Sequence, residues 1–133
     1  MSTGVCTDWT GIACSAMQVT TINLQHNNLS GDIPSSFGNL TGLTTIYLHG
    51  NTITSLPDTI GNLIHLKILG IDDNQLTALP DTIGDLTDLM ELACNINHLT
   101  SLPTTIGNLS SLHNLTVFDN QLTVLPDTIG NLT

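Results

Sequence analysis

Apolar and polar positions recur along this chain in a pattern that repeats every 23 residues. Four copies begin at Leu43, Leu66, Leu89 and Leu112, and a looser copy begins at Val19. They closely follow the template L-x-x-L-x-L-x-x-N-x-L-T-x-L-P-D-T-I-G-N-L-x-x. A fixed period of this length indicates a solenoid, in which each unit stacks on its neighbours instead of surrounding one central core.

The L-x-x-L-x-L segment of each copy predicts a β-strand with one buried face, because apolar and variable residues alternate there with the period of a strand. The copies run in the same direction, so the strands are expected to pair in parallel while the rest of each copy crosses back over the far side. Two inward columns are predicted: Ile46, Leu69, Leu92, Leu115 and Leu48, Ile71, Cys94, Val117. Cys94 is therefore expected to be a small buried side chain and not a reactive thiol.

An asparagine follows each strand, at positions 51, 74, 97 and 120. A buried amide both donates and accepts, so we expect this column to satisfy backbone groups where the chain bends. A proline then stands at the start of a predicted short 3₁₀ or irregular helical turn, at positions 57, 80, 103 and 126. The predicted fold class is an α/β solenoid with a parallel sheet on one side and short 3₁₀ or irregular segments on the other.

This template resembles the leucine-rich repeat family from about Val19 to the end of the chain. The resemblance implies a curved solenoid whose parallel sheet lines the concave side, with about five repeats over residues 19–133. Cys6, Trp9, Gly11 and Cys14 resemble the N-terminal cap of plant-type extracellular members, with one extra residue between cysteine and tryptophan. Residues 28–34 are similar to the plant-specific repeat, and the later units look like the shorter bacterial and protist type.

Cys6 and Cys14 lie ahead of the first repeat, in residues 1–18, which we interpret as the N-terminal cap. A bond between them would close a small loop and hold a terminus that is otherwise prone to fraying. We therefore predict a Cys6–Cys14 disulfide and, since disulfides persist in oxidising compartments, a secreted or extracellular location. Two free thiols in a flexible leader are the alternative. Zinc is disfavoured because no second pair of ligands stands at the required spacing.

The charge of the chain excludes several partners. Its net charge is −10, and Lys67 is its single basic side chain. Nucleic acids and anionic membranes require clustered Lys and Arg, so we expect neither as a partner. Every apolar run is interrupted after a few residues, and we therefore expect no membrane insertion. Residues 1–4 lack the regions of a secretory signal, which is compatible with a cytosolic protein or with a mature form.

The copies agree after the asparagine and differ at the outward strand positions. Residues 76–86 and 122–132 differ at only two positions, whereas the outward strand positions vary widely among the copies. One interpretation is that the concave face is diversified to bind a partner, and the other is recent duplication with a face that is free to vary. Exposed aromatic and aliphatic side chains favour binding. The predicted partner-binding residues are Tyr47, His49, Ile68, Asp72, Asp73, Glu91, Asn95, Ile96, Phe118 and Asp119.

Four carboxylates give this face a negative centre: Asp72, Asp73, Glu91 and Asp119. A protein or peptide of basic character is therefore the predicted partner. A divalent cation held by these residues with Asn95 is disfavoured, because rigid strands seldom converge enough oxygens on one ion. His49 and Asp72 resemble a catalytic pair, but no nucleophile, paired carboxylates at a cleft or phosphate loop accompanies them. We predict no enzyme activity, no metal and no cofactor.

The predicted function is thus a non-catalytic recognition module, of the kind found in receptor ectodomains or inhibitors. The alternative is a structural segment that self-assembles or acts as a spacer. A binder of ice or carbohydrate surfaces would instead use convex threonines at positions 59, 82 and 128. The sequence stops at Thr133, midway through the template, without a closing cap. Solenoids need a polar terminal unit, so either this sequence is part of a longer protein or the open edge pairs with something. We expect self-association through the last repeat.

Overall fold

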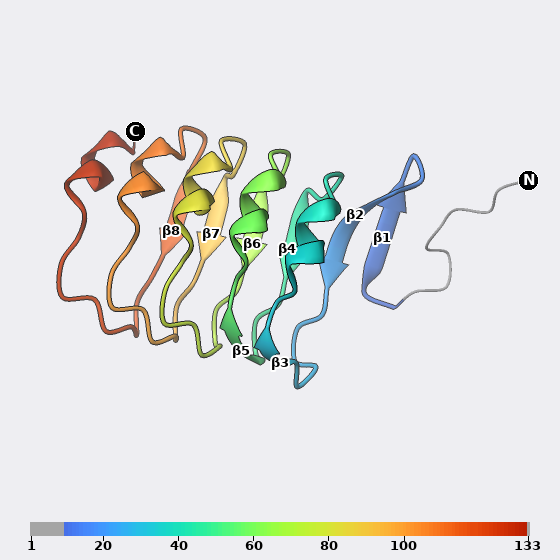
Figure 1. Ribbon diagram of the computed structural model, residues 1–133, viewed down its shortest axis with the longest axis horizontal. Helices are drawn as coiled ribbons and strands as arrows, with labels where there is room; N and C mark the ends of the chain where they lie inside the picture. Colours follow the sequence, from blue (N-terminus) through green and yellow to red (C-terminus); the bar gives the residue numbers. More distant parts are fainter. Residues whose placement is uncertain (1–9, 133) are drawn as a thin grey trace, which may run out of the picture.

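A computed structural model describes residues 10–132 as a row of stacked turns with a sheet along one side (Figure 1). The sheet has the strand order β1-β2-β4-β6-β7-β8. Its strands are β1 (Ile12–Ser15), β2 (Gln18–Asn23), β4 (Thr45–Tyr47), β6 (Ile68–Gly70), β7 (Glu91–Ala93) and β8 (Asn114–Thr116). β1 pairs antiparallel with β2, and every later neighbour pairs in parallel. The predicted parallel solenoid is confirmed.

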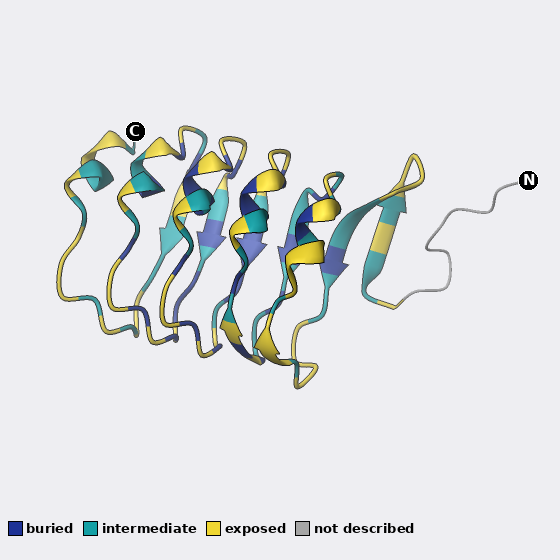
Figure 2. Ribbon diagram, in the orientation of Figure 1, coloured by how far each residue is buried: buried dark blue, intermediate teal, exposed yellow. Residues whose placement is uncertain are grey.

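The strand register joins equivalent positions of successive copies. Ile46 pairs with Leu69, and Leu69 pairs with Leu92. All three are fully buried, as the inward column requires, and Cys94 is buried with them. Figure 2 shows buried residues on both the strands and the turns of the middle repeats, whereas the last turn has none. The core is therefore a continuous slab between the two walls.

The wall opposite the sheet consists of five short 3₁₀ helices, one in each repeat. They are η1 (Ser35–Asn39), η2 (Asp58–Asn62), η3 (Asp81–Asp85), η4 (Thr104–Asn108) and η5 (Asp127–Asn131). A proline in extended conformation precedes each of them, as at Pro80 with φ −66° and ψ 148°. The predicted 3₁₀ turns are confirmed, and proline begins each turn because its ring already holds φ near the required value.

Threonine hydroxyls join three of the turns to the one before them, whereas Thr82 Oγ1 is buried without a hydrogen-bond partner in the described residues. Thr59 Oγ1 donates to the Ser35 carbonyl at 2.7 Å, and Thr105 Oγ1 donates to the Asp81 carbonyl at 2.6 Å. Thr128 does the same toward the preceding repeat. These hydroxyls bond backbone within the wall, so they are not directed outward as a regular polar array. That geometry disfavours the ice- or carbohydrate-surface hypothesis.

A second, two-stranded sheet joins the first two repeats, where β3 (Ser30–Asp32) pairs in parallel with β5 (Thr52–Ser55). The Asp32 carboxylate accepts hydrogen bonds from the hydroxyls of Ser55 at 2.7 Å and Thr54 at 2.8 Å. These two bonds lower the pKa of Asp32, because they stabilise its charged form. Among the described residues this second sheet is confined to the first two repeats, one of which carries the plant-like segment.

The asparagine column forms the predicted ladder. Asn97 Oδ1 accepts the Leu76 N–H at 2.9 Å, and its Nδ2 donates to the carbonyl of Ile71 at 3.1 Å. Asn74 repeats this arrangement with the Ile53 N–H and the Leu48 carbonyl. Each side chain therefore bonds the preceding repeat at the bend, and the predicted structural role is confirmed.

At the N-terminal end, β1 covers the edge of β2. The Asn23 N–H donates to the Gly11 carbonyl at 2.6 Å, and a Cβ at Gly11 would overlap the Asn23 carbonyl. Cys14 is disulfide-bonded, whereas Cys6 lies outside the described residues, so the predicted pair and the 1–18 cap stay predictions. No helix in residues 10–132 has the length and apolarity needed to span a bilayer.

Candidate functional site

The outward side chains of the parallel strands and of the four residues after each strand lie on one surface, which we call the sheet face. The backbone ladder continues past the strand ends. The Gly50 N–H donates to the Asp72 carbonyl at 3.2 Å, and the Ile96 N–H donates to the Phe118 carbonyl at 3.0 Å. Successive repeats therefore present equivalent positions about 4.8 Å apart.

The ten predicted residues differ in how far their side chains are exposed on this face. Five are half-buried along the strands or just after them: Tyr47, His49, Ile68, Asp72 and Glu91. Four are exposed after the strands: Asp73, Ile96, Phe118 and Asp119. Asn95 alone is buried. Nine of the ten side chains are thus open to a partner to some degree.

Three rings gather at the N-terminal half of the sheet face. The His49 ring lies edge-on to His26, with centroids 5.2 Å apart, and to Tyr47, with centroids 6.3 Å apart. Glycines make room for them, because a Cβ at Gly70 would lie 3.1 Å from Tyr47 Cδ1 and one at Gly50 would overlap the His26 ring. His26 was not among the predicted residues. The sequence feature that could have identified His26 is its position, which is equivalent to that of Gly50 in the next copy.

Asn95 acts as a clamp within the face. Its Nδ2 donates to Thr116 Oγ1 at 3.0 Å, and its Oδ1 accepts the Phe118 N–H at 3.2 Å. With 9% of its surface exposed, Asn95 offers little to a partner. Its role in this structure is to hold the backbone of Phe118 in place.

Cys94 is a buried thiol that lies beneath the same face. Burial, and secondarily the Asp72 carboxylate, raise the pKa of the Cys94 thiol to about 12. Both causes oppose formation of the thiolate, which is the reactive form. The prediction of a buried structural thiol is therefore confirmed.

One column of the sheet face has an unusual backbone. It follows the strands and consists of His26, Gly50, Asp73, Ile96 and Asp119, which we call the corner column. Every member has a left-handed backbone, with φ between 50° and 68°. This conformation costs most L-residues roughly 1–2 kcal/mol. Glycine, Asp and His tolerate it, whereas a β-branched residue such as Ile96 is a conformational outlier there.

Ile96 is exposed in spite of its chemistry. Its side chain is 48% exposed, and that of Phe118, on the adjacent repeat, is 61% exposed. The exposed parts of these two side chains do not stabilise the fold through burial, and they add contact area that is available to a partner. Sequence alone identified both residues as candidates but contained no sign of the left-handed conformation.

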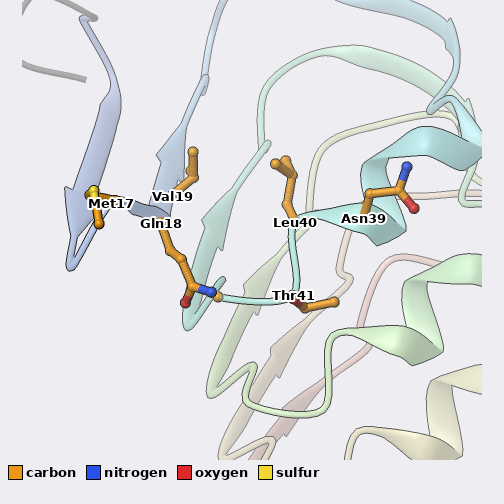
Figure 3. A pocket seen from close by; sticks show the side chains of 7 residues that line it. Met17, Gln18, Val19, Asn39, Leu40 and Thr41 are labelled. Carbon is orange, nitrogen blue, oxygen red and sulfur yellow. The ribbon is translucent and has the colours of Figure 1, made fainter. Parts of the chain in front are cut away.

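Shallow depressions occur at several places in residues 10–132, and two of them lie near the starts of strands. The first, of about 220 Å³, lies between the β1–β2 turn and the end of η1, lined by residues that include Met17, Val19 and Leu40 (Figure 3). The second, of about 380 Å³, contains Lys67 and Met90 where the strands begin. Neither contains a predicted residue. No cluster of three metal-ligating side chains occurs in residues 10–132.

Two family models match the chain. The model described as Leucine-rich repeat region matches residues 58–133, and the model described as Leucine rich repeat matches residues 18–76. Together they cover most of the parallel sheet and all the turns from η1 to η5.

Several solved structures with the same architecture come from plant receptors. A chain of the BIR3–SERK2 complex from Arabidopsis thaliana is 27% identical, with 96% of this chain and 72% of that chain covered and a TM-score of 0.85. The plant peptide hormone receptor RGFR1 in complex with RGF2 is 35% identical over 94% of this chain and 20% of that chain, with a TM-score of 0.82. The ectodomain of the Arabidopsis thaliana receptor kinase GASSHO1/SCHENGEN3, in complex with CASPARIAN STRIP INTEGRITY FACTOR 2, is 26% identical over 79% and 16%, with a TM-score of 0.65.

Proposed function

This chain belongs to the leucine-rich repeat family, and on that premise we propose that it is a non-catalytic recognition module that binds a protein or peptide through its sheet face. The observation that carries the proposal is the contrast between the two walls. The wall of 3₁₀ helices repeats nearly the same residues from η2 to η5, whereas the in-register outward positions of the sheet vary widely among the copies. A surface that is uniform in backbone and varied in side chains suits selective contact.

Similar proteins support a proteinaceous ligand. The RGFR1 receptor was solved with RGF2, and the BIR3 structure was solved with SERK2. The GASSHO1/SCHENGEN3 neighbour is an ectodomain. By this analogy, and with Cys14 in a disulfide, we propose a secreted or extracellular location for this chain.

The charge of the sheet face supports a ligand of basic character. Asp72 and Glu91 lie half-buried on neighbouring repeats, and the chain as a whole has a net charge of −10. Such a face accelerates the approach of cationic partners and disfavours acidic ones. Tyr47, which rests over the glycine of the next strand, supplies the rigid aromatic surface that dominates many interfaces.

Selection from a phage-displayed library of random twelve-residue peptides tests this proposal. The variant Tyr47→Ala/Asp72→Ala/Phe118→Ala removes an aromatic ring, a carboxylate and an exposed apolar side chain from the face. A matched variant, Ile64→Ala/Asp81→Ala/Asn62→Ala, removes exposed residues that lie off the sheet face. We expect enriched peptides to be rich in Lys and Arg, to lose at least about tenfold in affinity on the first variant, and to bind the second as they bind wild type.

Circular dichroism spectra identical to wild type establish that both variants fold. Failure of wild type to enrich any peptide beyond the triple sheet-face variant would contradict recognition and favour the structural or spacer role. Equal loss on both triple variants would also contradict it, because binding would then not depend on the sheet face.

A further inference from the structure

We propose that the corner column reads a three-point motif in an extended peptide: an apolar side chain placed against Ile96 and Phe118, flanked by two basic side chains that pair with Asp73 and Asp119. The inference rests on the proposed recognition function and names the ligand of that surface. Its partner is a peptide segment with one Lys or Arg two positions before the apolar residue and another two positions after it.

Register and backbone conformation place the three side chains side by side. The Asn74 N–H donates to the Ile96 carbonyl at 3.1 Å, and the Asn97 N–H donates to the Asp119 carbonyl at 3.2 Å. Asp73, Ile96 and Asp119 have φ values of 52°, 50° and 52°. Because equal backbone angles in equal register direct side chains the same way, an apolar residue stands between two carboxylates, each about 4.8 Å away along the column.

Backbone strain at Ile96 is the strongest indication that this residue serves contact and not folding. The other corner residues are His, Gly, Asp and Asp, which all accept a left-handed backbone. Isoleucine does not accept it readily, and the exposed half of its side chain contributes no burial that would offset the strain. Backbone strain of this kind is concentrated at functional sites in proteins.

Phe118 completes the apolar contact. The Phe118 carbonyl accepts the Ile96 N–H at 3.0 Å, and the Phe118 N–H donates to the side-chain oxygen of the buried Asn95 at 3.2 Å. The ring, 61% exposed, therefore sits on a backbone fixed from the preceding repeat. A backbone that is held in place limits the positions the ring can take, and this reduces the entropy lost on binding.

The two carboxylates have no cation of their own. Among residues 10–132 neither Asp73 nor Asp119 forms an ion pair, and the single lysine, Lys67, precedes β6 whereas Asp73 follows it. Both carboxylates are exposed on a strongly acidic chain. Cationic side chains from a partner complement them, and the apolar pair between them sets the position of those cations.

An extended peptide that runs across the strands fits this spacing. Its residues rise about 3.3 Å each, so side chains on one face recur about every 6.6 Å. The corner positions recur every ~4.8 Å, and the long, flexible side chains of Lys and Arg accommodate the difference of about 2 Å at each end. An apolar residue with basic residues two positions away on either side therefore meets all three points.

The test uses the peptides enriched by wild type from the random twelve-residue library, with affinities measured by fluorescence anisotropy. We expect the enriched set to contain the basic-x-apolar-x-basic motif. Ile96→Asn keeps the net charge and introduces a residue that favours the left-handed backbone. It is expected to raise the melting temperature and to weaken binding at least about tenfold. Ile64→Asn, at an apolar residue 51% exposed off the sheet face, serves as the control and leaves affinity unchanged.

The charge contacts are tested by pairing Asp73→Asn with peptides in which one basic residue is replaced by Gln. The two changes together are expected to weaken binding no more than the stronger one alone, because each removes the same ion pair. Affinity of Ile96→Asn within twofold of wild type, or a lower melting temperature, overturns the inference. If Ile96→Asn binds normally while Tyr47→Ala binds weakly, recognition through the sheet face stands and only the corner motif fails. If wild type enriches nothing, both fail.

Discussion

Replacing Asn97 by alanine tests how much the asparagine column contributes to stability. Asn97 is 5% exposed, and its Oδ1 is the acceptor for the N–H of the fully buried Leu76 at 2.9 Å. No other acceptor bonds that N–H in the described residues. The substitution therefore leaves a buried backbone donor without a partner.

The magnitude follows from what else Asn97 bonds. Its Nδ2 donates to three carbonyls, and each of them keeps another donor: Asn74 Nδ2 for Ile71, Asn120 Nδ2 for Cys94, and the Asp73 N–H for Asn95. Only one buried group is orphaned, which costs about 1–3 kcal/mol. We expect the free energy of unfolding to fall by about 2 kcal/mol, which corresponds to a melting temperature lower by about 8 °C.

Urea denaturation followed by circular dichroism measures this loss, and Asn120→Ala provides a matched control. Asn120 makes the same bond, to the Leu99 N–H at 3.0 Å, but it is half-buried, so water can replace its oxygen. We expect the control to cost less than about 1 kcal/mol. Equal losses at the two positions, or a loss below about 0.5 kcal/mol at Asn97, would refute the assignment of the ladder as a buried backbone acceptor.

Three further outcomes are expected. Gly50→Ala combines left-handed strain with overlap of the His26 ring, whereas Gly31→Ala has the strain alone. Urea denaturation should show Gly50→Ala to be less stable than Gly31→Ala by at least about 1 kcal/mol, and equal losses of stability would mean that the His26 ring is not held there. On folding, the pKa of Cys94 rises from 9.0 to about 12, so the stability that its neutral thiol contributes is complete below about pH 9 and is lost as pH rises toward 12. The free energy of unfolding of Cys94→Val should therefore decline less over this pH range than that of wild type, and equal pH profiles would contradict the prediction. Leu125 is 53% exposed in the last repeat, whereas its equivalent Leu102 is 5% exposed, and light scattering at high micromolar concentration should show association that Leu125→Asp abolishes; a monomeric wild type would exclude it.

The candidate surface was predictable in part. The alternation around Ile46 and Leu69 indicates which strand positions face outward, so the sequence alone assigns Tyr47, Asp72 and Phe118 to one face. Periodicity specifies direction relative to the core, because a strand reverses the side of its side chains at every residue. It does not specify what else a polar outward residue bonds.

Asn95 and His26 show that limit. Asn95 occupies an outward position, yet its amide bonds Thr116 and the Phe118 backbone, contacts that exist only after neighbouring repeats have stacked. His26 belongs to the loosest copy, and its contact with His49 depends on the glycine at position 50 in the next repeat. Both contacts join residues more than 20 positions apart, so no local pattern contains them.

The sequence by itself determined the solenoid, its parallel strands, its 3₁₀ turns and its buried asparagine column, because a strict repeat forces equivalent residues into equivalent environments. Tertiary structure alone decided which outward side chains remain free and where the backbone turns left-handed. The corner column turns left-handed because every repeat must bend at the same place, and the ladder of backbone hydrogen bonds imposes that bend on Ile96 as it does on Gly50. Sequence reveals the residue that stands there, and only the stacked neighbours reveal the conformation it must adopt.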